Sequence, residues 1–211
     1  MIRIPEQKNR NFIIASLFTL ATALYLIIDS FIIGKKEFFL MLNKDLGKTA
    51  DSFFSFWTNM GDGVIWIVIA TVFFIYRRNK IPLLIAAIVV STLITQVTKN
   101  YIFPAEPRPT AAIQDLSKIH TVTGVELLTA NSFPSGHTAT AFTIYLLACL
   151  FIRRTWIIPV GFLYAILVGY SRIYLAQHFP LDVGCGMLTA LISILISLYI
   201  QQAWEKRKPQ V

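Results

Sequence analysis

Residues 12–33 of this chain read FIIASLFTLATALYLIIDSFII, and a single charged residue, Asp29, interrupts the run near its end. A helix needs about 20 apolar residues to cross the hydrocarbon core of a bilayer. The run is too long for the core of a signal peptide, and it has no convincing small-residue cleavage site. It therefore predicts an uncleaved membrane anchor.

Five further apolar runs follow, so the sequence predicts an all-α integral membrane bundle of six transmembrane helices. Residues 35–60, between the first two spans, have an amphipathic pattern that favours a helix lying at the membrane interface. The whole chain, 1–211, is expected to form one membrane-embedded domain with a catalytic core at about 95–190. The five further runs are Val64 to Tyr76, Ile81 to Val97, Thr138 to Ile152, Trp156 to Tyr170, and Leu181 to Ala203.

The composition supports the same class of protein. Charged residues make up 14% of the chain and hydrophobic residues 55%, whereas a soluble domain carries about a quarter charged residues. The net charge of +8 comes from Lys and Arg in short clusters between the apolar runs. That distribution is typical of membrane orientation signals and argues against a nucleic-acid partner.

The distribution of basic residues also predicts the orientation. Six spans put both termini on one side, and more of the 19 Lys and Arg residues fall on that side than on the other. The positive-inside rule then predicts cytoplasmic termini, with the polar connection at about 100–132 outside. The basic residues on the side of the termini are Arg3, Lys8, Arg10, Arg77, Arg78, Lys80, Arg153, Arg154, Lys206, Arg207 and Lys208.

Three polar clusters fall at the predicted outer edge of the membrane. Because they share one membrane depth, we expect them to meet in one pocket, although they are far apart in sequence. The clusters are Lys99 with Arg108 after the third span, Pro134-Ser135-Gly136-His137 at the start of the fourth, and Ser171-Arg172 through His178 to Asp182 between the fifth and the sixth.

Lys99, Arg108 and Arg172 are like charges in a chain that is poor in charge. Each alone is typical of a side chain that extends to the lipid headgroups. Three together are tolerable where an anion with several negative charges lies among them, and guanidinium groups fit phosphate oxygens two at a time. The three cations therefore predict a phosphate-binding site.

Residues 134–137 are typical of a helix N-terminus, whose free N–H groups and dipole attract an anion. Gly136 lets the backbone approach a ligand. The Ser135 hydroxyl can cap the helix and can also contact phosphate. His137 lies one residue inside the helix, where it can give a proton to a leaving oxygen.

His178 and Asp182 lie four residues apart, and Pro180 between them indicates a helix start. In the first turn, Asp182 can hydrogen-bond one ring nitrogen of His178 and fix its tautomer. The other ring nitrogen is then free to attack phosphorus. A lone histidine or aspartate at such a place is usually structural, but beside Arg172 and His137 the pair predicts a catalytic nucleophile, His178.

These residues resemble the type 2 phosphatidic acid phosphatase superfamily, and within it the bacterial membrane lipid phosphatases. The second and third parts of the family pattern, P-S-G-H and S-R-x5-H-x3-D, are matched without change. In the first part, K-x6-R-P, residues 100–107 separate Lys99 from Arg108, two more than the pattern has. We expect a bulge around residues 103–106 to absorb the extra pair.

The resemblance implies a two-step reaction. His178 attacks phosphorus while His137 protonates the leaving oxygen, and water activated by His137 then splits the phosphohistidine. No Asp/Glu cluster for Mg²⁺ is evident in the sequence, so a metal-independent enzyme without a cofactor is expected. The groups implied to hold the phosphate oxygens are Lys99, Arg108, Arg172 and the amides of Ser135 and Gly136.

The resemblance leaves three bacterial substrates open: undecaprenyl diphosphate, a lipid A phosphate and phosphatidylglycerol phosphate. The first two are preferred, since both present phosphate on the outer side of the membrane in a Gram-negative envelope. The expected place is thus the bacterial inner (cytoplasmic) membrane, with the active site facing the periplasm or the outside and its entrance shaped by residues 110–131.

Two other classes of protein fit part of the pattern. A non-catalytic lipid-binding or transport protein would use the cations but would not need both histidines and Asp182. A vanadate-using haloperoxidase shares the anion pocket by resemblance, but its soluble helical body conflicts with six spans.

Overall fold

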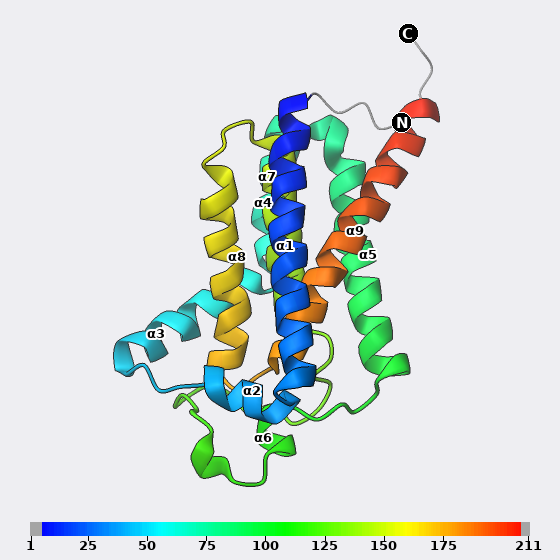
Figure 1. Cartoon of the computed structure of the whole chain (residues 1–211). Helices are drawn as coiled ribbons and strands as arrows, with labels where there is room; N and C mark the ends of the chain where they lie inside the picture. The colour runs from blue at the N-terminus through cyan, green and yellow to red at the C-terminus, as the bar shows by residue number, and fades with distance from the viewer. Residues whose placement is uncertain (1–5, 208–211) are drawn as a thin grey trace.

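The structure is a computed structural model that describes residues 6–207, with side chains described from Arg10 on. Over these residues the chain forms helices and connecting loops, without strands (Figure 1). The predicted all-α class is confirmed. The helices that run along the bundle are α1 (Glu6–Ile32), α4 (Ile65–Tyr76), α5 (Ile81–Val97), α7 (Gly136–Phe151), α8 (Ile157–Tyr174) and α9 (Pro180–Arg207).

Each of the six predicted spans lies in one of these helices, but the helices differ in length. Four segments are long and apolar enough to cross a membrane, namely Arg10–Ile32, Arg78–Ile102, Ile157–Tyr174 and Pro180–Arg207. Lys48–Gly61 and Ile65–Tyr76 form a fifth candidate when counted together, with a bend of 50° between them. The sixth, Gly136–Phe151, is a shorter apolar helix. The protein is thus a multi-pass membrane protein with four or five candidate spans among the described residues, and the predicted count of six includes two short helices.

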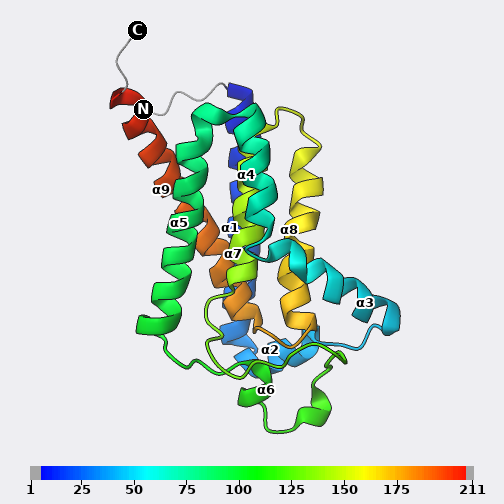
Figure 2. The ribbon, with the colours of Figure 1, turned by 180° about the vertical axis from the view of Figure 1, so that it is seen from behind.

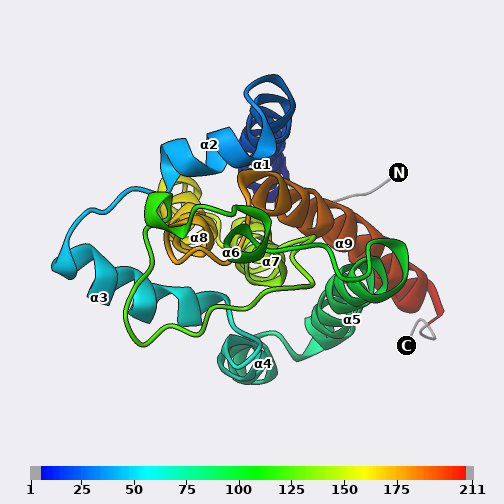
Figure 3. The same cartoon turned by 90° about the horizontal axis from the view of Figure 1, so that it is seen from below.

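The predicted interfacial helix over residues 35–60 was wrong in one respect, because the chain forms two helices there, α2 (Lys35–Leu42) and α3 (Lys48–Trp57). Gly47 between them has a φ of 85°, a left-handed conformation that glycine adopts at no steric cost. Both helices run across the bundle axis rather than along it (Figures 1 and 3). α2 lies at the end of the bundle where the three polar clusters lie, whereas α3 lies beside α8.

Helix α7 lies at the centre of the bundle and packs against α1, α5, α8 and α9. Gly186 of α9 allows a close approach, because a Cβ there would lie 2.6 Å from the Ser135 carbonyl oxygen at the start of α7. The outer faces carry apolar side chains such as Leu17, Ile67 and Leu93, each more than half exposed. Apolar surface of that extent suits contact with lipid better than contact with water.

Figure 2 shows the other end of the bundle, where α1 begins and α9 ends. Side-chain contacts join the helix termini there. Asn11 Nδ2 donates to the carbonyl oxygen of Ile152 at 3.0 Å, and Lys80 pairs with Glu205 at 2.6 Å. The basic loops 77–80 and 153–154 lie at this end. Of the basic residues assigned to it, Arg3, Lys208 and the side chain of Lys8 fall outside the described part of the chain.

A buried asparagine joins the covering segments to the bundle. Asn43 Nδ2 donates to the carbonyl oxygens of His120, Ile173 and Tyr174 at 3.1, 3.0 and 2.9 Å. Its Oδ1 accepts from the amide of His120 at 2.7 Å. One side chain thus ties the loop at 113–132 and the end of α8 to the segment after α2.

We expect Asn43→Ala to destabilise the protein by about 2 kcal/mol, because it leaves buried carbonyl and amide groups without partners. The unfolding temperature of the purified protein in detergent should fall by about 4–8 °C. Asn100→Ala serves as the control, since Asn100 is exposed and bonds only to Gln96. Equal unfolding temperatures for the two variants would contradict this role for Asn43.

Candidate active site

The three polar clusters meet at the end of the bundle near α2 and α6 (Pro109–Ala112). Figure 3 shows the ribbon from that side. His178 lies in the short connection between α8 and α9, where its amide donates to the Arg172 carbonyl oxygen at 3.0 Å. The side chains of Lys99, Arg108, Arg172 and His137 all lie close enough to His178 for their charges to act on it. The sequence prediction that the clusters converge therefore matches the geometry.

His178 is buried, with 2% of its surface exposed. Its Nδ1 lies 3.5 Å from Asp182 Oδ2 and 3.5 Å from the Ser132 hydroxyl, which itself donates to Asp182 Oδ2. The amide of Phe179 donates to the same carboxylate oxygen at 3.0 Å. The predicted pair of His178 and Asp182 is thus in contact but looser than a good hydrogen bond, and Ser132 lies beside it.

Burial and the nearby positive charges of Arg108 and Arg172 hold the pKa of His178 well below the usual value of 6.5. The ring is therefore neutral at pH 7. Nδ1 faces Asp182 and Ser132, whereas Nε2 forms no hydrogen bond within the described residues. A neutral imidazole with a free ring nitrogen is a nucleophile.

Arg108 is held in place by oxygen atoms from two segments. Its Nη1 donates to the backbone oxygen of Gln177 at 2.9 Å and to Gln177 Oε1 at 3.1 Å. Its Nε donates to the Ala130 carbonyl oxygen at 2.9 Å. Burial lowers the pKa of Arg108, but a guanidinium keeps its charge in proteins.

Arg172, near the end of α8, is 7% exposed. Its Nη1 donates to Thr58 Oγ1 at 2.5 Å, in the 3₁₀ turn η1 (Thr58–Gly61). Its Nε is buried without a hydrogen-bond partner among the described residues, and so is Asp182 Oδ1. A buried donor without a partner is costly in a folded protein, and a bound anion would satisfy the donor of Arg172.

Lys99 lies in a π-helical turn, η3 (Thr98–Ile102), that continues α5. It makes no hydrogen bond or ion pair that involves the described side chains. A turn at Phe103–Ala105 lies between Lys99 and Arg108, and Ala105 there has a φ of 60°. The Glu106 carboxylate that follows this turn pairs with Lys35 of α2 at 2.6 Å.

The start of α7 has the geometry expected of a helix N-terminus. Ser135 is the N-cap, and its hydroxyl accepts from Thr138 N at 3.4 Å and from Thr138 Oγ1 at 2.9 Å. A Cβ added to Gly136 would meet only Thr95, at an ordinary 3.5 Å. Protein packing therefore does not require glycine at this position, which is consistent with an open space for a ligand beside the backbone.

His137 has a neighbour that the sequence motifs do not contain. Its Nε2 lies 3.9 Å from Asp62 Oδ2, in the turn that precedes α4. About a third of the His137 side chain is exposed. Asp62, Thr58, Ser132 and Gln177 are thus four residues at the site that sequence reasoning missed. Ser132 and Gln177 flank motif residues in the sequence, which was a usable signal, whereas Thr58 and Asp62 gave none.

The site itself holds no group of three metal-ligating side chains among the residues described. The one such group there, Asp45, Asp51 and His120, lies on α3 and the segments beside it, and it shares no residue with the three clusters. The two ring nitrogens of His120 face different carboxylates, Nε2 toward Asp51 at 3.0 Å and Nδ1 toward Asp45 at 3.9 Å. This arrangement suits an imidazole that bridges two carboxylates better than three side chains that bind one metal ion.

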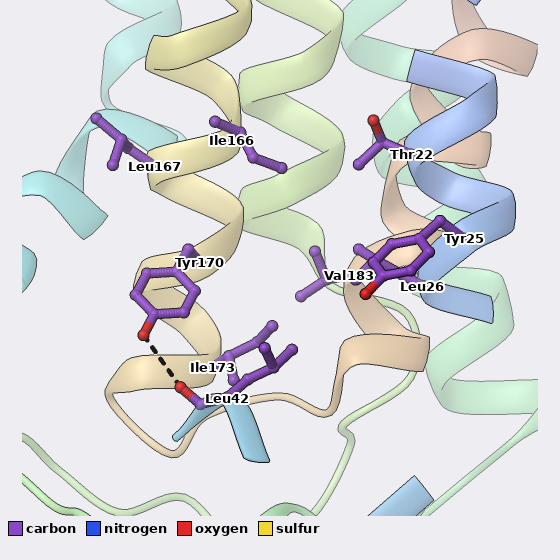
Figure 4. A pocket seen from close by; sticks show the side chains of 9 residues that line it. All are labelled: Thr22, Tyr25, Leu26, Leu42, Ile166, Leu167, Tyr170, Ile173 and Val183. Atoms are coloured by element: carbon purple, nitrogen blue, oxygen red, sulfur yellow. Dashed lines mark hydrogen bonds between the residues drawn. The ribbon is translucent and has the colours of Figure 1, made fainter. Parts of the chain in front are cut away.

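A cavity of about 330 Å³ opens between α1 and α8, with Leu26, Ile173 and Val183 in its lining (Figure 4). The Tyr170 hydroxyl, also in the lining, donates to the Leu42 carbonyl oxygen at 3.0 Å. No charged side chain lines this cavity. It suits hydrocarbon rather than phosphate and is not part of the cation site.

Comparison with known proteins adds independent information. The family model described as PAP2 superfamily matches residues 80–206. An undecaprenyl-diphosphatase of Sulfolobus acidocaldarius is 27% identical over 82% of this chain and 81% of its own length. The crystal structure of LpxE from Aquifex aeolicus is 35% identical, with a TM-score of 0.67 over 76% of this chain and 92% of that one.

A third similar protein supports the fold alone. The crystal structure of a transmembrane PAP2 type phosphatidylglycerolphosphate phosphatase from Bacillus subtilis has a TM-score of 0.58 and 21% identity. The similarity covers 95% of this chain and 99% of that one. The helical arrangement is therefore shared across nearly the whole of both chains.

The low pKa of His178 gives a prediction that needs no substrate. The chain has only three histidines, so their ring signals can be followed by NMR in isotopically labelled protein, and His178→Gln assigns the one of interest. Because burial and neighbouring cations disfavour the charged ring, His178 should stay neutral at pH 6.5 and take up a proton only below it. A midpoint at or above pH 6.5 would contradict the electrostatic argument.

Proposed function

The chain belongs to the PAP2 superfamily, and on that premise we propose that it removes the terminal phosphate of undecaprenyl diphosphate through a phosphohistidine on His178. It is a membrane lipid phosphatase. The lipid and the covalent intermediate are the parts of the proposal that go beyond the family. The observation that carries them is a neutral His178 with a free Nε2 beside Lys99, Arg108 and Arg172.

In the first step, His178 Nε2 forms a bond to phosphorus while the bond from phosphorus to the leaving oxygen breaks. His137 gives its proton to that oxygen. Asp182 and Ser132 hold Nδ1–H and stabilise the positive charge that develops on the ring. The three cations and the amides at the start of α7 stabilise the charge on the transferred phosphate oxygens.

In the second step, His137 is neutral and takes a proton from a water molecule. The oxygen of that water bonds to phosphorus as the bond to His178 Nε2 breaks. Inorganic phosphate leaves, and both histidines return to their starting protonation states. Three cations and a helix N-terminus can neutralise the transferred phosphate, so no step requires a metal ion.

Two observations favour undecaprenyl diphosphate among the lipids considered. The undecaprenyl-diphosphatase relative is similar over most of both chains. A diphosphate also carries more negative charge than a phosphate monoester, which suits a site with three cations and few acidic groups to offset them. The site lies at the end of the bundle, where a headgroup can enter while its hydrocarbon tail stays in the bilayer.

The arrangement of charge supports an orientation as well. The basic loops 77–80 and 153–154 lie at the end of the bundle away from the site. By the positive-inside rule that end faces the cytoplasm, so both termini are cytoplasmic and the site faces the periplasm or the outside of a bacterial inner membrane.

The experiment that tests the function measures phosphate release by the purified protein in detergent. Undecaprenyl diphosphate, lipid A and phosphatidylglycerol phosphate are compared as substrates at equal mole fraction. The proposal expects the highest kcat/KM for undecaprenyl diphosphate. A higher value for either other lipid would reject the substrate assignment, and binding without phosphate release from any of them would favour a lipid-binding or transport protein.

We expect His178→Ala to lower phosphate release by about 10³-fold or more, because the reaction loses its nucleophile. Acid-labile radioactive phosphate should be trapped on the wild-type protein after a rapid quench and should be missing from the variant. His120→Gln is the control, since His120 lies apart from the three clusters and pairs with Asp51. Phosphate trapped on His178→Ala would assign the nucleophile to another residue.

Activity should not depend on a divalent cation. Purified protein that has been treated with EDTA and dialysed into metal-free buffer should keep its rate within about twofold, because protein cations supply the charge stabilisation. Restoration of a lost rate by Mg²⁺ alone would show that the three cations are insufficient.

A further inference from the structure

A turn that belongs to none of the three motifs lies against two of them. The turn consists of η1 and the following Asp62-Gly63, and it joins α3 to α4. Thr58 Oγ1 accepts the 2.5 Å hydrogen bond from Arg172 Nη1. Asp62 Oδ2 lies 3.9 Å from His137 Nε2. The same turn thus contacts a phosphate-binding cation at one end and a catalytic histidine at the other.

The turn is fixed in this position by specific contacts. The hydroxyl of Tyr164 in α8 donates to the Met60 carbonyl oxygen at 2.6 Å. Gly61 fits directly against α7 and α8, because a Cβ there would lie 2.9 Å from the His137 carbonyl oxygen and 2.5 Å from Val168 Cγ1. Such distances exclude any larger residue unless the helices move apart. The packing of Gly61 against α7 and α8 therefore holds the turn close to His137.

Within the turn, the Asp62 carboxylate is oriented by its own backbone. Its Oδ1 accepts from the amide of Val64 at 3.2 Å, two residues further along the chain. This hydrogen bond is an Asx turn, which fixes the side-chain rotamer. The other oxygen, Oδ2, is the one that faces His137.

The charges around His137 give this carboxylate a chemical role. Burial and the positive charges of Arg172, Lys99 and Arg108 hold the pKa of the His137 ring well below its usual value, yet a general acid must carry a proton when the substrate binds. In the described part of the chain, Asp62 is the carboxylate whose charge favours that proton. Asp182, the other carboxylate at the site, lies beside His178 and accepts hydrogen bonds from Ser132 and Phe179.

We propose that Asp62 is a positioning residue whose charge favours the proton on His137 and keeps the ring oriented toward the leaving oxygen during phosphate transfer. The inference rests on the proposed function. At 3.9 Å the carboxylate acts through its charge rather than through a direct hydrogen bond. Thr58, in the same turn, acts on Arg172 and hence on the bound phosphate, so the turn serves two parts of the site by different means.

The test compares two phosphate esters with different leaving groups in detergent micelles. Decyl phosphate releases an alcohol, which needs a proton as it leaves, whereas 4-nitrophenyl phosphate releases a stabilised phenolate that needs none. The constant measured is kcat/KM, because it reports the steps up to the first irreversible transfer of phosphate. For Asp62→Asn we expect a loss of about tenfold or more on decyl phosphate and little change on 4-nitrophenyl phosphate.

Three further variants separate charge from structure. Asp62→Glu restores the charge and should recover part of the rate on decyl phosphate. Thr58→Val removes the acceptor for Arg172 and should lower the rate on both esters alike, since both need phosphate binding. Asp45→Asn is the matched control, because Asp45 also accepts from the amide two residues on and is exposed, but it lies in the connection between α2 and α3 and belongs to none of the three clusters. It should leave both rates unchanged.

The outcomes distinguish a failure of the role of Asp62 from a failure of the proposed phosphatase function. Equal losses on the two esters for Asp62→Asn, or no loss on either, overturn the role assigned to Asp62 and leave the phosphatase intact. If the wild-type protein releases phosphate from neither ester nor from the lipids, the proposed function fails and the inference fails with it. A loss confined to decyl phosphate supports both.

Discussion

The positive charge at one end of an apolar bundle is the constraint on which the rest of the structure depends. Three cations lie close to one another and to two histidines. Because the positive charges repel each other, each guanidinium needs oxygen atoms around it. Arg108 obtains them from Gln177 and Ala130, and Arg172 from Thr58. The loop at 113–132 and the turn after α3 thus supply oxygen atoms to the two guanidinium groups.

Much of this architecture is predictable from the sequence because the bilayer leaves few alternatives. Apolar runs of span length predict helices, and the helix starts at Ser135 and Pro180 are where capping and proline chemistry place them. The convergence of the motifs follows from membrane depth alone. The length of each helix does not, since α7 is surrounded by other helices and need not reach span length, whereas α4 forms a candidate span only together with Lys48–Gly61.

Other features depend on contacts that no local pattern encodes. The interfacial stretch divides because Asn43 is drawn into hydrogen bonds with residues far along the chain and Gly47 then turns the backbone. Thr58 and Asp62 approach the site only because Gly61 lets their turn pack against α7 and α8. Such residues reach the site only through contacts made in the folded structure, so the sequence around them predicts an ordinary loop before a helix.

The amide of Ser135 donates to the carbonyl oxygen of Asp182 at 3.0 Å, which joins the start of α7 directly to the start of α9. Both partners are main-chain atoms, so substitution of either side chain leaves the bond in place. The separation of His137 and His178 is thereby fixed in part by the main chain. The side chains of the covering loops can vary while this link between the two helix starts is kept.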